Sequence, residues 1–264
     1  MGKVGETAIN DIELYNSRMA KSLIDKIFFM DKLDDDIKFI TDYGCADGAL
    51  IGFLAPLFPE IMFFGFDLDE QMVACAQKNY GYLPNVMITD KMSDIFNYDN
   101  FNASCTALNM SSLIHEVYSY STDEAIEEFW NSINSAGFKY IITRDMCLDN
   151  STHRPALKED IVKIKSHYDV DKITEFEYYH GSINDNYNMI HFLLKYRYKE
   201  NWNREVKENY LPLTVEEIAT KVDSKYNLIY MDHYILPYIA RTVEEDFGIV
   251  LKDYTHAKFI YKLR

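Results

Sequence analysis

Residues 42–50, with the sequence DYGCADGAL, combine residue types and spacing that suit the binding of a nucleoside cofactor. An apolar run, 37–40, precedes them and another follows, which predicts a first strand, a tight loop and a first helix of a doubly wound α/β domain. Gly44, Ala46 and Gly48 keep the loop free of bulk, so that a ligand can lie against backbone N–H groups at the helix start. The same geometry serves dinucleotides and other adenosine cofactors.

A second acidic position supports this interpretation. Asp67 lies 19 residues beyond Gly48, at the end of an apolar run, 61–66, that predicts a buried second strand. A carboxylate at this position can accept hydrogen bonds from both hydroxyls of a ribose. Asp69 is the expected N-cap of the next helix, which we expect to reach about Asn79. Asp67 is therefore the ribose candidate, and Asp69 is the structural one.

The loop departs from the dinucleotide fingerprint, in which glycines follow the spacing G-x-G-x-x-G. Starting at Gly44, this chain has Ala46 and Ala49 at the second and third glycine positions. It resembles instead the first motif of class I S-adenosylmethionine-dependent methyltransferases, acidic-x-Gly-x-Gly-x-Gly. Asp42, Gly44 and Gly48 match this motif, and Ala46 replaces its middle glycine. The resemblance implies a methyltransferase that uses S-adenosylmethionine and releases S-adenosylhomocysteine.

The resemblance also implies a fold. We expect a Rossmann-like α/β fold with a doubly wound, mostly parallel seven-stranded sheet, an N-terminal helix and a mainly helical insertion after the fifth strand. The similarity covers residues 37–147 well and the final strands more loosely. The third to fifth strands are expected at 85–90, 103–110 and 139–143, and the last two at 228–231 and 256–263.

Further cofactor contacts follow from the resemblance. Cys45 and Leu68 are expected beside the cofactor because they flank the loop glycine and the ribose carboxylate. Asn109, at the end of the fourth strand, should face the cofactor. Asp90, at the end of the third strand, corresponds to a residue that often holds the adenine amino group. The alternative for Asp90 is a cap on a short helix at 92–96.

The candidates for chemistry follow the fourth and fifth strands. His115 has the pKa range of a general base, and Glu116 could orient it or bind the substrate. The alternative is that His115 only packs in the cleft wall. Arg144 and Asp145 are candidate substrate contacts, or else a buried ion pair that joins the core to the insertion. Tyr118 is a further substrate candidate, in an aromatic wall that could also include Tyr120, Tyr178 and Tyr179.

We expect one methyltransferase domain over 1–264, with an N-terminal helical cap at 1–35, a cofactor-binding core at 36–146, a helical substrate cap at 147–212, and a last core helix and strands at 213–264. A helix over 9–31 could place Tyr15 at the substrate, or could be only a covering helix. Within the cap, the sequence predicts helices at 156–168 and 186–209 and a strand or extended link at 172–179. A smaller insertion, 236–254, should hold a helix ended by Gly248.

The amino-acid composition limits the classes of partner that the protein is expected to bind. The chain has 42 acidic and 27 basic residues, a formal net charge of −15, which disfavours a nucleic-acid surface. Basic residues between Lys195 and Lys207 alternate with glutamates, so we interpret them as a solvated helix with ion pairs. A metal is not expected, although His115 and Glu116 could join His153 or His180 at a metal.

The sequence contains no apolar stretch long enough for a membrane span and no signal region, and its four cysteines lack paired spacing. We therefore expect a cytoplasmic monomer or homodimer. The predicted function is methyl transfer from S-adenosylmethionine to a small-molecule acceptor in a capped cleft. An RNA methyltransferase and a non-catalytic S-adenosylmethionine-binding protein remain as alternatives.

Overall fold

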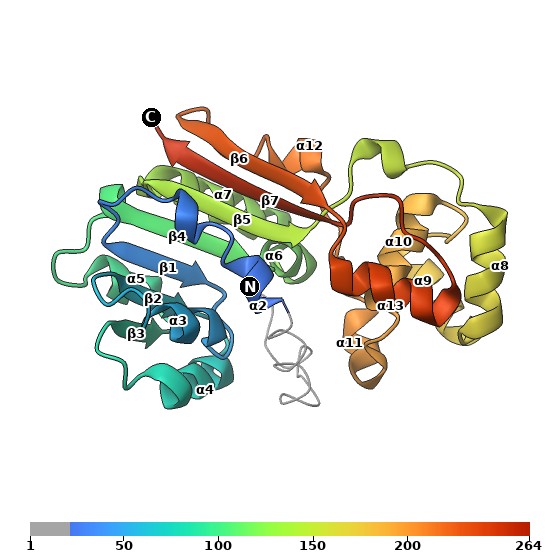
Figure 1. The fold of residues 1–264 in the computed structure, drawn as a ribbon, viewed down its shortest axis with the longest axis horizontal. Helices are drawn as coiled ribbons and strands as arrows, with labels where there is room; N and C mark the ends of the chain where they lie inside the picture. The colour runs from blue at the N-terminus through green and yellow to red at the C-terminus, as the bar shows by residue number, and fades with distance from the viewer. Residues whose placement is uncertain (1–21) are drawn as a thin grey trace.

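A computed structural model describes residues 22–264. The described chain forms two lobes: a twisted sheet flanked by helices, and a second lobe made mainly of helices (Figure 1). The seven strands are β1 (Phe39–Tyr43), β2 (Met62–Phe66), β3 (Val86–Thr89), β4 (Thr106–Ser111), β5 (Tyr140–Met146), β6 (Tyr226–Tyr234) and β7 (His256–Leu263).

The sheet has the strand order β3-β2-β1-β4-β5-β7-β6. Strands β1 to β5 are parallel, and β7 pairs antiparallel with both β5 and β6. The central strands are almost wholly buried, which explains their continuous apolar sequences, because helices cover both faces of a parallel sheet. The expected doubly wound seven-stranded sheet is confirmed, and the order reverses between β1 and β4, where ligands bind in such sheets.

Helices pack on both faces of this sheet. On one face, Leu108 and Met110 of β4 pack with Trp130 and Ile133 of α7; on the other, Ala107 of β4 packs in a separate core. The alternation along β4 therefore serves two hydrophobic cores. The helices of this lobe are α3 (Ala49–Leu54), α4 (Glu70–Tyr80), α5 (Met92–Phe96), α6 (Ile114–Tyr120), α7 (Asp123–Ala136) and α12 (Val215–Ile218).

The second lobe has its own hydrophobic core, in which the two expected insertions pack together. Phe176 and Phe192 come from the larger insertion, and Val243 and Phe247 come from the smaller one. The helices are α8 (Lys158–His167), α9 (Val170–His180), α10 (Asn186–Lys195), α11 (Trp202–Glu205) and α13 (Pro237–Phe247), with short 3-10 turns at Asn150–Thr152 (η4) and Lys199–Asn201 (η5). Gly248, with φ +64°, ends α13 as expected.

Two expectations for this lobe were wrong. The segment 172–179 is helical, inside α9, because Ile173 and Phe176 are one turn apart and both enter the core. The expected helix 186–209 is interrupted after Lys195 and resumes as α11. Pro155, before α8, pairs with Asp185 in an isolated bridge.

The N-terminal part differs from the expected continuous helix. Within the described residues, α2 (Leu23–Lys26) is a single turn, and a 3-10 turn, η2 (Met30–Lys32), follows it. Ile27 and Phe28 lie between these two turns and pack against the core of the sheet lobe. The expected helix residues before Ser22, including Tyr15, lie outside the described residues.

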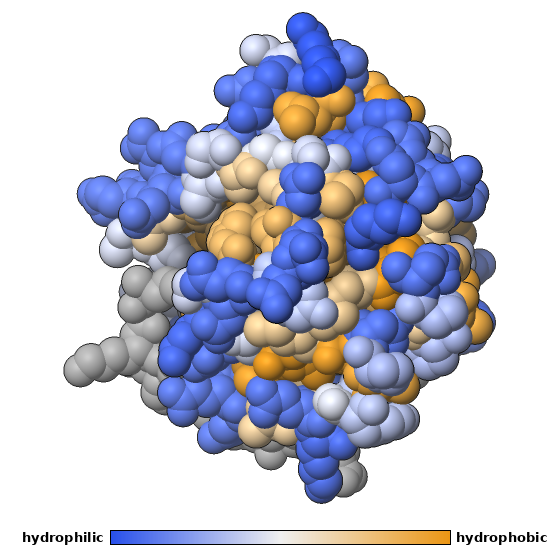
Figure 2. All heavy atoms as spheres, turned by 90° about the vertical axis from the view of Figure 1, so that its left-hand side faces the viewer, coloured by the Kyte–Doolittle hydropathy of each residue, from blue (hydrophilic) through white to orange (hydrophobic). Residues whose placement is uncertain are grey.

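The surface of the sheet lobe carries apolar groups among polar ones. Figure 2 shows, on the face that lies at the left in Figure 1, an apolar area bordered by hydrophilic residues. Apolar atoms contribute about half or more of the accessible surface of folded proteins, so exposed apolar groups are normal. Among residues 22–264, no helix has the length and apolar character needed to cross a membrane.

Candidate active site

The loop after β1 is shaped by backbone conformation. Gly44, Ala46 and Gly48 all have positive φ angles, of +81°, +48° and +78°. A Cβ on Gly44 would lie 2.8 Å from Cδ1 of Leu113, so the Leu113 side chain would have to move, and the positive φ of Gly44 disfavours any side chain here. Ala46 adopts the left-handed conformation that costs a non-glycine residue roughly 1–2 kcal/mol. The glycines of the motif are therefore explained by local geometry.

The N–H groups of this loop are used within the protein. Those of Gly44 and Cys45 donate to the carbonyl oxygen of Phe66, at 2.8 and 3.0 Å. That of Ala46 donates to Oδ2 of Asp67, at 2.9 Å. Each of these three N–H groups thus already has an acceptor, and so does that of Ala49 at the helix start, which donates to Oδ1 of Asp47 at 3.2 Å. What the loop offers a ligand is therefore a surface free of bulky side chains.

Asp67 joins the loop to the start of α4. Its Oδ1 accepts a hydrogen bond from the backbone of Asp69, at 3.0 Å, and its Oδ2 holds Ala46. Burial raises the pKa of Asp67 above its usual value. Asp69 caps α4, as expected, by accepting from the N–H groups of Gln71 and Met72. The side chain of Asp67 remains partly exposed at the carboxyl end of β2.

Asp42 lies inside β1 rather than after it. It is buried, with 4% of its surface exposed, and Nδ2 of Asn109 on β4 donates to its Oδ1 at 2.7 Å. Burial raises the pKa of Asp42 to about 6. Asn109 itself accepts a hydrogen bond from Ser111. Asn109, which was expected to face the cofactor, has its side-chain amide on the buried carboxylate of Asp42.

The remaining expected cofactor residues surround the loop. Cys45 is buried, and burial raises the pKa of its thiol well above the usual value. Leu68 is exposed beside Asp67. Asp90 follows β3 and is partly exposed. The alternative that Asp90 caps α5 is wrong, because the N-cap residue is Lys91, and the backbone N–H of Lys91 donates to Oγ1 of Thr89.

His115 lies in a buried hydrogen-bonded chain. Its Nδ1 is 2.7 Å from Oδ1 of Asp145, and its Nε2 is 3.3 Å from Oε1 of Glu208. Asp145 also accepts a hydrogen bond from the backbone N–H of His115. Burial lowers the pKa of His115, but the two carboxylates outweigh burial and hold this pKa well above its usual value. A protonated imidazole donates hydrogen bonds and is not a base at neutral pH.

Glu116 does not orient His115, since Asp145 has that position. Its side chain is 35% exposed, and its Oε1 lies 3.5 Å from Nη2 of Arg204. Desolvation in the cavity and the nearby Glu208 carboxylate raise the pKa of Glu116 to about 7. His115, Glu116 and Glu208 bring three potential ligand atoms within 4.8 Å of one another. His153 instead stacks on Tyr187, and His180 contacts the carbonyl of Val206.

The basic residues expected on a solvated helix include two that belong to this cluster. Lys195 is completely buried, and its Nζ donates to the carbonyl oxygens of Glu205 and Glu208, at 2.9 and 2.5 Å. Burial lowers the pKa of Lys195 to about 7. Arg204 lies 2.9 Å from Oε1 of Glu205 and 3.4 Å from Oε2 of Glu208. The solvated interpretation is therefore wrong for Lys195 and Arg204, and neither belongs to an open nucleic-acid surface.

Arg144 and Asp145 lie within β5, on opposite faces. Asp145 holds His115, whereas Nη2 of Arg144 lies 2.8 Å from Oδ2 of Asp25 on α2. Arg144 also donates to Oγ of Ser112, at 3.0 Å. The expected ion pair between core and insertion is wrong, because Arg144 joins the core to α2.

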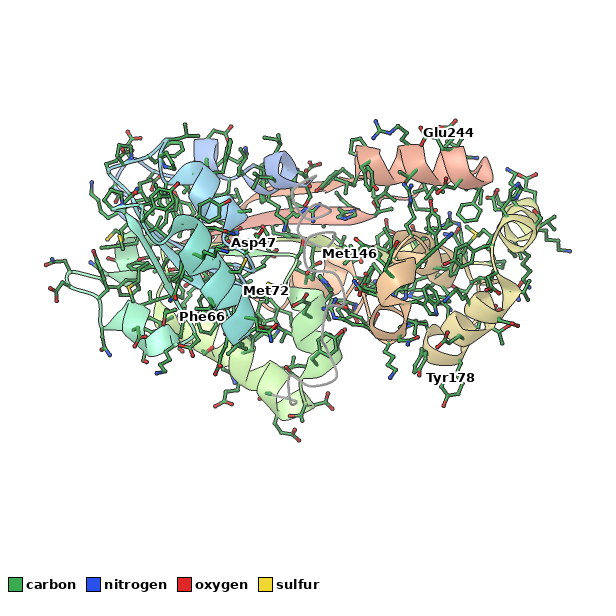
Figure 3. All side chains as sticks on the ribbon, turned by 90° about the horizontal axis from the view of Figure 1, so that it is seen from below. Asp47, Phe66, Met72, Met146, Tyr178 and Glu244 are labelled. Carbon is green, nitrogen blue, oxygen red and sulfur yellow. The ribbon has the colours of Figure 1, made fainter. Side chains whose placement is uncertain are left out.

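The tyrosines expected as one aromatic wall are divided between α6 of the sheet lobe and α9 of the second lobe. Tyr118 packs in the core of the sheet lobe, where its hydroxyl accepts a hydrogen bond from Nε1 of Trp130. Tyr178 is exposed on the second lobe, far from Met146 at the junction of the lobes (Figure 3). Tyr120 donates a hydrogen bond to Glu208 at 3.1 Å. Tyr210, which the sequence did not single out, donates to Glu205 and packs against His115.

A cavity of about 140 Å³ lies between the lobes, at the carboxyl ends of β4 and β5. Glu205, Glu208 and Tyr210 reach it from positions about 90 residues beyond His115, which is why adjacency in sequence could not identify them. Its lining includes Ser112, His115, Glu116, Arg144 and Met146 from the sheet lobe, and Leu193, Leu194, Arg204, Glu205, Glu208, Tyr210 and Ile239 from the second.

No protein-family model and no curated protein matches this sequence. Several solved structures are similar in fold. An S-adenosylmethionine-dependent methyltransferase from Anabaena variabilis is 13% identical, with a TM-score of 0.52, over 100% of this chain and 99% of that one. TnmH is 9% identical with a TM-score of 0.53, and the mitomycin 7-O-methyltransferase MmcR is 14% identical with a TM-score of 0.50.

Each of the latter two alignments covers 95% of this chain and 57% of the other, so the chain spans little more than half of either protein. At these identities the similarity concerns the fold. It agrees with the strand order and with the antiparallel final hairpin. The chain has the fold of the class I S-adenosylmethionine-dependent methyltransferases.

Proposed function

We propose that this chain is a cytoplasmic methyltransferase that transfers a methyl group from S-adenosylmethionine to a small molecule in the cavity between the lobes. The observation that carries the proposal is the contact between the loop and the cavity wall. Gly44 packs against Leu113, and the next residues along the chain are Ile114, His115 and Glu116. A cofactor beside the loop would therefore present its reactive end to the cavity.

The groups around the loop match the chemistry of S-adenosylmethionine. Each oxygen of Asp67 accepts one backbone N–H and keeps a lone pair for a ribose hydroxyl. Asp42 is a buried carboxylate whose pKa stays raised, at about 6, although the amide of Asn109 and the charge of Lys26 both act to lower it, so a further cation would stabilise its charged form. When bound, the cofactor supplies a methyl group on a sulfonium for in-line displacement.

The cavity favours a small acceptor. Its volume of about 140 Å³ is close to that of an engineered protein cavity that binds benzene, about 150 Å³. The second lobe closes one side, which would hold the acceptor in line and exclude water. A nucleic-acid acceptor has less support, because Lys195 and Arg204 are engaged with Glu205 and Glu208.

Among the groups that line the cavity, Glu116 is the best placed to accept a proton. Its pKa of about 7 suits a base that works near neutral pH, whereas His115 already carries its proton between two carboxylates. His115 would then act as a hydrogen-bond donor that positions Glu208.

Calorimetry with S-adenosylmethionine tests the proposal. We expect the native chain to bind the cofactor and Asp67→Ala to weaken binding at least tenfold. The matched control is Asp69→Ser, which keeps an N-cap side chain on α4 but changes a neighbouring carboxylate. No binding by the native chain, or equal binding by Asp67→Ala, would refute the assignment. Release of S-adenosylhomocysteine with candidate acceptors then tests turnover.

A further inference from the structure

The charged groups that line the cavity are unbalanced. Three of the cations each lie against an acidic side chain, although Asp25 also binds Lys258, at 2.5 Å, and His115 also lies 3.3 Å from Glu208. The pairs are Arg144 with Asp25 (2.8 Å), His115 with Asp145 (2.7 Å) and Arg197 with Asp246 (3.6 Å). Arg204 is the remaining cation among the lining residues that the structure describes.

Arg204 faces three carboxylates. Its guanidinium lies 2.9 Å from Glu205, 3.4 Å from Glu208 and 3.5 Å from Glu116. The protonated His115 also lies 3.3 Å from Glu208, and Glu116 is the farthest of the three from the guanidinium, so Glu116 is the least compensated of these carboxylates. Lys195 lies behind the cluster and, because burial lowers its pKa to about 7, is only partly charged at neutral pH.

We propose that the acceptor is an amine with a small apolar body, and that it enters the cavity as an ammonium ion bound by Glu116. This inference rests on the proposed methyltransferase function. The exposed fractions of the carboxylates identify Glu116 as the contact: its side chain is 35% exposed, whereas those of Glu205 and Glu208 are 2% exposed. Glu205 and Glu208 then act behind it as a fixed negative field.

The wall opposite the charges fits the body of such a molecule. Leu193, Leu194 and Ile239 from the second lobe and Met146 from β5 supply hydrocarbon surface. Burying an apolar group against such a wall contributes about 25 cal/mol per Å². The cavity therefore combines an anionic end with an apolar wall, which matches an aryl or alkyl amine.

Other ligand classes fit less well. A carboxylate or phosphate acceptor would place negative charge beside the carboxylate of Glu116, and each lining cation already has an acidic partner. A divalent metal between His115, Glu116 and Glu208 would lie close to the guanidinium of Arg204 and would leave the apolar wall without a function.

The proposed step is balanced in atoms and charge. The bound ammonium gives one proton to the carboxylate of Glu116, which frees the lone pair on the nitrogen. The nitrogen then attacks the methyl carbon, the carbon–sulfur bond breaks, and its electron pair stays on sulfur as the neutral thioether. The methylated nitrogen is a secondary ammonium, and Glu116 returns its proton to water.

Binding of three ring-sized probes tests the proposal. Benzylamine, benzyl alcohol and benzoate are titrated by calorimetry into the full chain saturated with S-adenosylhomocysteine. We expect benzylamine to bind at least tenfold more tightly than either other probe. Glu116→Gln should weaken benzylamine binding at least tenfold and leave S-adenosylhomocysteine binding unchanged. Glu244→Gln, on the outer surface of α13, is the matched control (Figure 3).

Several outcomes would overturn the amine assignment. These are equal or tighter binding of the alcohol or benzoate, no binding of any probe to the cofactor-loaded protein, and unchanged benzylamine binding by Glu116→Gln. Binding of Mn²⁺ that depends on Glu116 and excludes benzylamine would assign the site to a metal instead. Failure of the chain to bind S-adenosylhomocysteine at all would instead count against the proposed methyltransferase function.

Discussion

The loop of residues 44–48 and the charged cluster around His115 lie at the same edge of the sheet but are assembled from different distances along the chain. The loop and its partner Asp67 fall within 24 consecutive residues, and backbone hydrogen bonds connect them. The cluster joins His115 to Glu208 through side chains 93 positions apart. We call the loop and Asp67 the donor side, for the methyl donor, and the cluster around His115 the acceptor side. The donor side is thus fixed by local backbone geometry, whereas the acceptor side depends on how the second lobe is placed.

This difference predicts that a substitution on one side can change the function of that side and leave the other side unchanged. The largest separation is expected for Glu116→Gln, which should lower the rate of methyl transfer by about 10²- to 10⁴-fold, because it removes the proposed base. Affinity for S-adenosylmethionine should stay within about twofold of the native value, since Glu116 lies outside the donor loop. Steady-state kinetics and calorimetry on the same preparations measure both quantities.

The pH profile serves as the control for this variant. A base acts in its deprotonated form, so the native rate should rise with pH through about 7, the pKa of Glu116. Lys195 also has a pKa of about 7 but lies behind the cluster. If the same rising limb persists in Glu116→Gln, the titrating group is not Glu116, and Lys195 becomes the candidate.

Arg204→Met should show how much the acceptor side contributes to the stability of the fold. It removes the guanidinium from three carboxylates, and breaking a buried ion pair in this way costs about 3–5 kcal/mol in the free energy of unfolding. Arg197→Met is the control, because Arg197 and Asp246 are both more than 40% exposed and should contribute at most about 1 kcal/mol. Urea denaturation measures both. Equal losses would mean that the cluster is not an electrostatic unit.

The sequence was sufficient for the sheet and for the local features of the loop region. Apolar runs set the strands, and the acid at the end of β2 and the cap at Asp69 are local features that need no knowledge of distant contacts. The acceptor cluster could not be predicted in the same way. Alternating Arg and Glu residues near 204–208 have the pattern of an exposed helix, and only the packing of the second lobe buries them. The helix α9 was missed because tyrosines and β-branched residues favour strands.

Asp42→Asn should reveal a smaller effect, on the donor side itself: the free-energy cost of keeping the carboxylate of Asp42 charged while it is buried. Raising the pKa of this carboxyl from 3.8 to about 6 corresponds to about 3 kcal/mol. The folded protein binds this proton more tightly than the unfolded chain does, so Asp42 lowers stability progressively as the pH rises from about 4 to about 6. Asp42→Asn should therefore raise the free energy of unfolding at pH 7 by up to this amount.

The same variant should weaken binding of S-adenosylmethionine, because the negative charge of Asp42, although it destabilises the fold, attracts a cationic ligand. Urea denaturation at pH 5 and at pH 7 tests the sign: the gain should be larger at pH 7. A variant that is destabilised at both values would show that the carboxylate of Asp42 already has adequate compensation in the unliganded fold.

The smallest effect is expected at Ala46, the position where the loop departs from the methyltransferase motif. Ala46→Gly relieves the left-handed backbone but adds freedom to the unfolded chain, so the net gain in stability should be below about 1 kcal/mol. Ala46→Val should be less stable than both, since a β-branched residue tolerates positive φ poorly. Thermal denaturation ranks the three. If valine were as stable as alanine, the left-handed conformation would not be required here, and the shape of the loop would not explain the glycines of its motif.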